Sequence, residues 1–180
     1  MSANPAILKK IAEARASGGG NLIQDGKYRL TVLKLLLEQK YNGTCFIAEF
    51  LVDTAMAVFD DVKPNAPGTT CSFVVNMDGA GKLSAAGNIK QFILALMGEE
   101  EGNVTGSDFQ ATLGELISDA QPARGMQIDD ETFRKFARSG KNSEADSKGR
   151  PPMTMSRWTT VRQTAEEITA QRKTLDAGDR

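Results

Sequence analysis

Alternating hydrophobic and polar residues predict two long β-strands, over 27–37 and 44–52. The residues between them, 38–43, end in Asn42-Gly43. Asn-Gly is the strongest short signal for a hairpin turn, because both residues tolerate a positive φ. The sequence therefore predicts that the two strands form one β-hairpin.

The first of these strands changes phase part-way along. Leu30 and Val32 alternate with polar neighbours, whereas three later leucines fall on the opposite parity: Leu33, Leu35 and Leu37. A shift of one residue turns every later side chain to the other face, so the pattern predicts either a β-bulge at 33–34 or a strand covered on both faces. A helix over 30–38 is the alternative, since several of these leucines also share helical spacing.

The rest of the chain reads as three more strands and four helices. The strands are expected at 69–77, at 124–136 with an interruption at 129–131, and at 153–161. The helices are expected at 1–17, 89–98, 106–119 and 163–175. Three parts follow: an N-terminal helix and glycine linker (1–20), a central domain (21–162) and a polar C-terminal helix or tail (163–180).

This order predicts a mainly β protein with helices, of the α+β class. Five strands with a helical insert between strands three and four, and helical termini, are the layout of an OB-fold-like Greek-key barrel. The residues expected to share its core are Leu30, Val32, Phe73, Val75, Ile89, Phe92, Ile93, Leu96 and Met126. Trp158 is expected to pack in this core rather than to stack on a base.

Composition places the protein among ordinary globular proteins and narrows its chemistry. Of its 180 residues, 40% are hydrophobic and 25% charged, and none is histidine. Without histidine, the commonest general base and metal ligand are missing. We therefore expect no enzyme, no cofactor and no metal site. No apolar run approaches the ~18 residues of a transmembrane helix, and the N-terminus lacks the apolar core of a signal peptide, which predicts a cytoplasmic protein. Cys45 and Cys71 are then expected as buried thiols, with a disulfide between them as the alternative that a cytosolic location disfavours.

Positive charge gathers toward the C-terminal end, where residues 123–160 carry eight Lys or Arg against five Asp or Glu. In an OB-fold, the loops between strands one and two and between strands four and five flank the binding face. Tyr41, in the first loop, is the leading candidate for base stacking, with Phe133, Phe136 and Trp158 as others. The candidate nucleic-acid-binding residues are Lys40, Tyr41, Arg134, Lys135, Arg138, Lys141, Lys148, Arg150 and Arg157. A plain solvated surface is the alternative for the cations.

Several short strings also resemble a family of bacteriophage single-stranded DNA-binding proteins of the OB class. They are Gly26-Lys27-Tyr28-Arg29-Leu30, Phe46-Ile47-Ala48-Glu49-Phe50, Pro64-Asn65-Ala66-Pro67-Gly68, Gly87-Asn88-Ile89-Lys90-Gln91-Phe92 with Leu96-Met97-Gly98, and Ala123-Arg124-Gly125-Met126. The resemblance covers about 20–161 and rests on turn glycines and helix faces. One departure is the charge-balanced end of the chain, where many single-strand binders carry an acidic tail that recruits partners.

The expected function is non-catalytic coating of single-stranded DNA during phage replication or recombination, in the host cytoplasm. The expected partner is single-stranded DNA. Single-stranded RNA, a second copy of the chain and phage replication or recombination proteins are further candidates, and no membrane is expected. The alternative is an OB-fold module for protein interaction or assembly that binds no nucleic acid.

Overall fold

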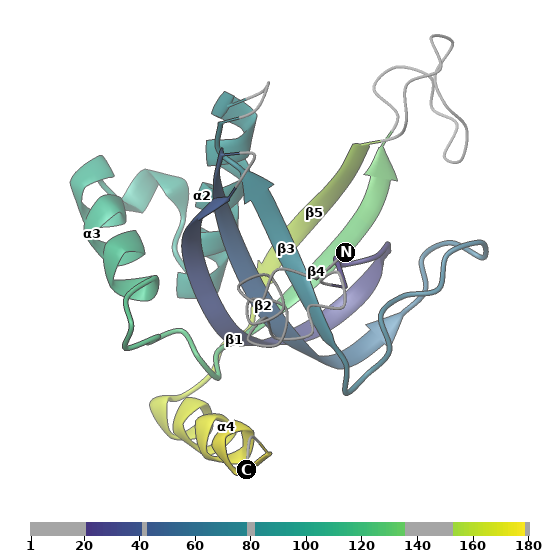
Figure 1. The fold of residues 1–180 in the computed structure, drawn as a ribbon. Coiled ribbons are helices and arrows are strands. Elements are labelled where there is room, and N and C mark those ends of the chain that lie inside the picture. Colours follow the sequence, from purple (N-terminus) through teal and green to yellow (C-terminus); the bar gives the residue numbers. More distant parts are fainter. Residues whose placement is uncertain (1–20, 41–42, 79–81, 136–152, 179–180) are drawn as a thin grey trace, which may run out of the picture.

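In the computed structural model the protein is a five-stranded antiparallel sheet with helices, described over residues 21–40, 43–78, 82–135 and 153–178 (Figure 1). The strands are β1 (Gly26–Lys40), β2 (Gly43–Met56), β3 (Thr70–Asn76), β4 (Gln127–Lys135) and β5 (Met153–Thr160). The helices are α2 (Lys82–Met97), a short 3₁₀ turn (Glu101–Asn103), α3 (Gly106–Leu116) and α4 (Ala165–Gly178). The α+β prediction is confirmed. The helix expected at 1–17 lies outside the described residues.

The strand order in the sheet is β3-β2-β1-β4-β5, and every neighbouring pair is antiparallel. β3 and β5 form the two edges, so the described sheet is open. A short N-terminal segment adds one parallel bridge to an edge, between Leu22 and Ser72 of β3. The expected closed barrel, and with it the OB-fold class, stays a prediction.

The β1–β2 hairpin is confirmed, and so is the bulge at 33–34. Val32 pairs with Phe50 whereas Lys34 pairs with Glu49, which leaves Leu33 as the extra residue. Before this point Leu30 and Val32 are fully buried; after it, Leu35 is the fully buried residue. The bulge therefore keeps leucines of both parities in one core, and the helical alternative for 30–38 is wrong.

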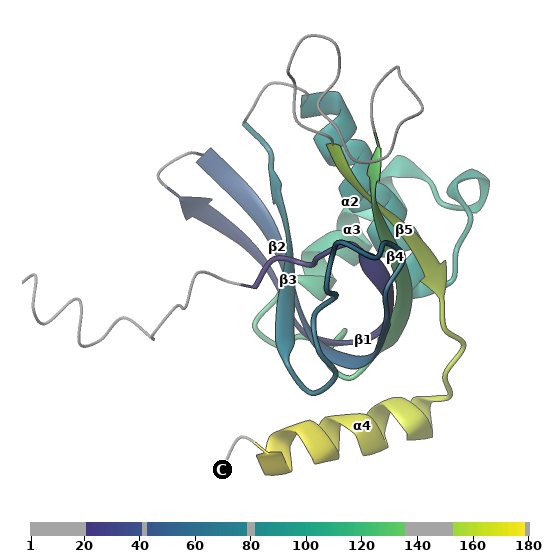
Figure 2. The same ribbon diagram turned by 90° about the vertical axis from the view of Figure 1, so that its right-hand side faces the viewer.

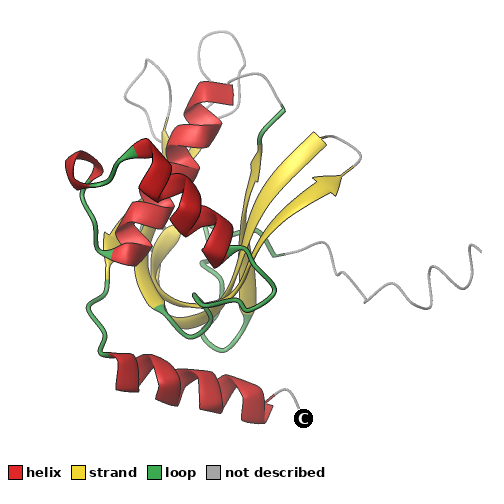
Figure 3. Ribbon diagram, turned by 90° about the vertical axis from the view of Figure 1, so that its left-hand side faces the viewer, coloured by secondary structure: helices red, strands yellow, loops and turns green. Residues whose placement is uncertain are grey.

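The core lies between the sheet and α2, which contacts β3, β4 and β5. All nine residues expected there belong to it, seven as buried residues and two, Phe73 and Met126, as half-buried ones. Phe92 of α2 stands at its centre, with ring centroids 5.9 Å from Phe46 and 4.9 Å from Trp158. Trp158 thus packs in the core, as the sequence predicts. α3 lies on the same side of the sheet as α2 (Figure 3).

The fourth strand differs from the prediction in two ways. Residues 124–126 form a turn instead of strand, because Gly125 has a φ of +86° and the chain reverses there. The predicted interruption at 129–131 is also wrong, since β4 runs through these residues without a break. The neighbouring strands explain this, because β1 and β5 both pair with the acidic stretch and supply hydrogen-bond partners for its backbone.

No described helix is long and apolar enough to span a membrane.

The C-terminal helix, α4, is polar as predicted but it docks on the domain (Figure 2). No residue of α4 is fully buried, and hydrogen bonds join it to the turn that precedes β4. The Arg172 guanidinium donates to the backbone carbonyl oxygens of Pro122 and Arg124. Arg124 in turn pairs with Asp176, at 3.2 Å. The contact between α4 and the turn at Gly125 is close, because a Cβ atom added to Gly125 would lie 2.8 Å from Cγ of Arg172.

We expect Arg172→Ala to lower the free energy of unfolding by about 1–2 kcal/mol, since a charged donor to two backbone carbonyls is lost from a half-buried position. Chemical denaturation measures the change. Lys173→Ala is the matched control, because Lys173 is the exposed neighbour on the same helix, and it should leave stability within about 0.5 kcal/mol of wild type. Equal losses in both variants would show that the docking of α4 contributes nothing to stability.

Candidate nucleic-acid interface

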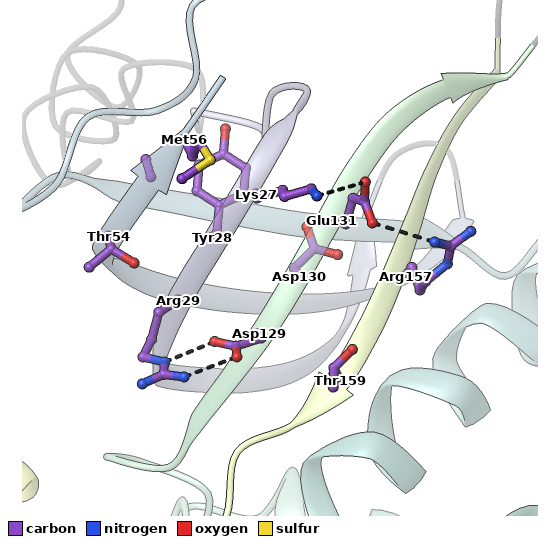
Figure 4. Close-up of a pocket in the computed structure, with 11 residues that line it drawn as sticks. Lys27, Tyr28, Arg29, Thr54, Met56, Asp129, Asp130, Glu131, Arg157 and Thr159 are labelled. Atoms are coloured by element: carbon purple, nitrogen blue, oxygen red, sulfur yellow. Dashed lines mark hydrogen bonds and ion pairs between the residues drawn. The ribbon is translucent and has the colours of Figure 1, made fainter. Parts of the chain in front are cut away.

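The candidate site is a polar trough on the face of the sheet that points away from the core (Figure 4). Strand pairing arranges its side chains in two rows that cross four strands. One row is Met56, Lys27, Glu131 and Arg157; the other is Thr54, Arg29, Asp129 and Thr159. These residues share the face because alternate residues of a strand point the same way and antiparallel partners lie side by side.

Ion pairs run along both rows. Arg29 binds Asp129 with two hydrogen bonds of 2.9 and 3.0 Å, whereas Lys27 and Arg157 approach Glu131 at 3.7 and 3.4 Å. The hydrogen bonds that Arg29 donates to Asp129, more than the charge of Asp129, raise the pKa of Arg29 further above its usual value. All three cations are exposed, and exposed pairs contribute only about 0–1 kcal/mol each.

This arrangement suits the binding of an anion. The trough is a shallow hollow of about 440 Å³ that presents three cations to solvent. The carboxylates that pair with these cations, Asp129 and Glu131, line the trough as well, so a phosphate has to compete with them for the cations. Arginine competes better than lysine, since its planar fork matches phosphate oxygens two at a time. Arg29 and Arg157 are therefore the side chains of the trough best suited to hold a phosphate.

An aromatic ring continues the face beyond Arg157. The Arg157 guanidinium carbon lies 5.4 Å from the centroid of the Phe133 ring, within the range of a cation–π contact. Phe133 pairs with Met155 across β4 and β5, on the same face as the trough. A cation beside a half-exposed ring is the combination that single-stranded nucleic acids use, with phosphate on the cation and a base on the ring.

A buried carboxyl group lies behind the trough, on the core side of β4. Asp130 is 3% exposed, and Thr132 Oγ1 donates to its Oδ2 at 2.5 Å. Its Oδ1 has no hydrogen-bond partner within the described chain. Burial raises the pKa of Asp130 to about 7, and the neighbouring charge of Glu131 adds to the rise against the hydrogen bonds from Thr132 and Ser156. This carboxyl group therefore titrates near neutral pH.

The candidate residues inferred from the sequence are only partly placed. Arg157 lies in the trough, whereas Lys40 lies at the end of β1, outside the trough, and pairs with Glu38 at 3.3 Å. Arg134 and Lys135 occupy β4 opposite Thr154 and Met153, and their side chains are not described. Tyr41, Arg138, Lys141, Lys148, Arg150 and the stacking candidate Phe136 lie outside the described residues.

Sequence reasoning missed Lys27 and Arg29 as site residues. A signal existed, since both are outward residues that alternate with the inward Tyr28 and Leu30. These outward positions indicate a site only once β4 is known to be a continuous strand, because β4 places Asp129 and Glu131 opposite Arg29 and Lys27.

Other chemistry is sparse. Within the described residues, no group of three or more Cys, Asp or Glu side chains could hold a metal ion. Cys45 and Cys71 are free and buried, as predicted, and burial raises the pKa of Cys71 to about 12. Such a thiol stays protonated at neutral pH and is unreactive.

No protein-family model matches the chain, and no curated protein is similar enough to count as a relative. The resemblance to bacteriophage single-stranded DNA-binding proteins therefore stays a prediction from the sequence.

Proposed function

We propose that this chain is a non-catalytic single-stranded DNA-binding protein of the OB-fold class, of bacteriophage type, that coats DNA during replication or recombination. The order β3-β2-β1-β4-β5, with α2 between β3 and β4, supports the fold assignment. An OB barrel has this order and differs in one respect, the additional closure of its two outer strands. Fold alone does not define a function, so the proposal depends on the site.

The observation that carries the proposal is the group of three exposed cations on the trough: Lys27, Arg29 and Arg157. Arg157 belongs to the β4–β5 hairpin, whose connecting residues, 136–152, carry four more cations in the sequence. In OB-folds this connection and that of the β1–β2 hairpin flank the bound strand. A line of cations that leads from the sheet toward such a connection suits the phosphate backbone of a flexible single strand.

Salt dependence tests this function directly. Each phosphate neutralised on a single strand contributes about −0.7 to the slope of log K against log salt concentration. The three trough cations alone therefore predict a slope of about −2, and three further contacts from Lys141, Lys148 and Arg150 bring it to about −4. Arg157→Ala should reduce that slope by about 0.7 in magnitude, and Lys141→Ala/Lys148→Ala/Arg150→Ala together by about 2. Fluorescence anisotropy of a labelled oligo-dT, titrated at several salt concentrations, measures all three proteins.

Lys173→Ala serves as the matched control, because Lys173 is an exposed cation on α4 outside the trough. It should bind with the wild-type slope. Binding with equal affinity at low and high salt, or none to either DNA or RNA, would contradict the proposal. The assembly module without nucleic-acid binding would then take its place.

A further inference from the structure

A second hollow lies where the open sheet would have to close, between the edge strands β3 and β5 beside α2. We call it the seam groove, and its volume is about 330 Å³, at the lower end of the roughly 300–1,000 Å³ of small-molecule sites. Its inner wall is aromatic: Phe73 of β3 and Trp158 of β5 stand edge to face, with ring centroids 5.1 Å apart. Among the described residues, none of those that line it is charged.

Apolar side chains gather at the rim of the seam groove. The described chain exposes six large hydrophobic residues, and three of them line this one hollow: Leu22 at 53%, Val74 at 42% and Met155 at 38%. Contiguous exposed apolar surface with polar neighbours marks a binding site more often than scattered exposed residues do. The polar neighbours here are the exposed amides of Asn88 and Gln91, on α2.

The seam groove is continuous with the trough. A third hollow runs along the flank of β5, and it shares Met155 and Trp158 with the seam groove. The same hollow contains Phe133 and shares Arg157 with the trough. A path therefore leads from the cations of the trough, past the Arg157–Phe133 pair, to the uncharged groove between the edge strands.

We propose that the seam groove binds nucleobases of the same single strand whose phosphates lie along the trough. The inference rests on the proposed function and adds to it a separate site for bases. A nucleobase is flat and uncharged, and amide-like donors and acceptors line its edge. An aromatic wall, exposed amides and a described lining without charge match those three properties, whereas that lining holds no cation to neutralise a phosphate. The cations that phosphate needs lie further along the path, at Arg157, Arg29 and Lys27.

The test compares two DNA strands of equal length, an oligo-dT and an abasic oligomer with the same phosphate backbone. Trp158 is the only tryptophan of the chain, so its emission reports on the seam groove and on the adjoining hollow beside β5. We expect oligo-dT to quench Trp158 at saturation, and the abasic strand to leave the emission unchanged. Stacking adds about 1–3 kcal/mol for each base, so the abasic strand should bind at least about 5-fold more weakly at equal salt.

A double variant, Met155→Ala/Gln91→Ala, removes groove surface at two exposed positions without opening the core. It should weaken oligo-dT binding about 5-fold with an unchanged salt slope and an unchanged affinity for the abasic strand. The matched control is Met97→Ala/Gln110→Ala, whose residues are exposed on α2 and α3 and lie outside the groove. It should bind both strands as wild type does.

Three results would overturn the inference. If oligo-dT binds with the expected salt slope while Trp158 is not quenched and the groove variant binds like wild type, the groove holds no base and the proposed function stands. If neither strand binds at low salt, the inference and the proposed function fail together. If the groove variant changes only the sedimentation of the protein, the groove is a contact between protein chains.

Discussion

Phe92→Ala should lower the free energy of unfolding by about 3–5 kcal/mol, which is the usual cost of a phenylalanine removed from a closed core. Phe92 is fully buried and reaches the core from α2. Its ring lies 4.9–6.0 Å from those of four aromatic residues: Phe46, Phe50, Phe73 and Trp158. These residues come from β2, β3 and β5, so the cavity left by the substitution would loosen α2 from three strands at once.

Chemical denaturation followed by circular dichroism measures this loss. The free energy of unfolding of a small domain is only about 5–15 kcal/mol, so the variant should be only marginally stable at 37 °C. Phe133→Ala is the matched control, since the same ring is removed from the outer face of the sheet, where it is half-buried. It should cost well under half as much. Similar losses at the two positions would show that Phe92 is not at the centre of the core.

Asp130→Asn should make the protein less sensitive to pH and, above pH 7, more stable than wild type. The pKa of Asp130 is about 7 in the fold, against an ordinary value of 3.8. Between these values the folded protein keeps a proton that the unfolded chain releases, so wild-type stability falls as pH rises from 4 to 7 and is level above. One pKa unit corresponds to about 1.4 kcal/mol, so the loss is up to about 4 kcal/mol.

Asparagine is uncharged between pH 4 and 7, so the variant does not lose the stability that wild type loses when Asp130 ionises. Urea denaturation at pH 4.5, 6 and 8 should show its advantage over wild type growing by a few kcal/mol. Tyr28 and Cys71 both have a pKa of about 12 and stay neutral throughout. Asp129→Asn, on the exposed face of the same strand, should keep the wild-type trend. Wild-type stability that rises from pH 5 to 8 would contradict the assignment.

Local patterns predicted most of the architecture. The Asn42-Gly43 signal in the sequence predicted the hairpin, and the parity change at Leu33 located the bulge, because both signals lie within a few residues of their effect. The helix beginning at 89 was found by its apolar spacing, although α2 starts earlier, at Lys82. The residues of α2 before Ile89 lack that apolar spacing, so the pattern could not predict that they are helical.

The trough could not be found in this way, because its partners are far apart in the chain. Arg29 and Asp129 form their pair across a separation of 100 residues, and neither position is unusual alone. Three acidic residues in a row indicate a solvated turn when read locally. In the fold, Asp129 and Glu131 instead lie in a strand and face cations of the adjacent strand β1. Asp130 lies in the same strand and is buried.

The same long-range pairing of β1 with β4 also bears on how the protein folds. β1 and β2 are joined by the shortest connection in the sheet and can form early, whereas β4 reaches β1 only after β3, α2 and α3 have been passed. Closing so large a loop costs chain entropy before any contact repays it. The high contact order of this sheet therefore places its folding in the slow range of small domains, milliseconds to seconds rather than microseconds. Until β4 pairs with β1, the backbone N–H and C=O groups along that edge of β1 have no strand partner. The folding chain is therefore most prone to aggregation before β1 and β4 pair.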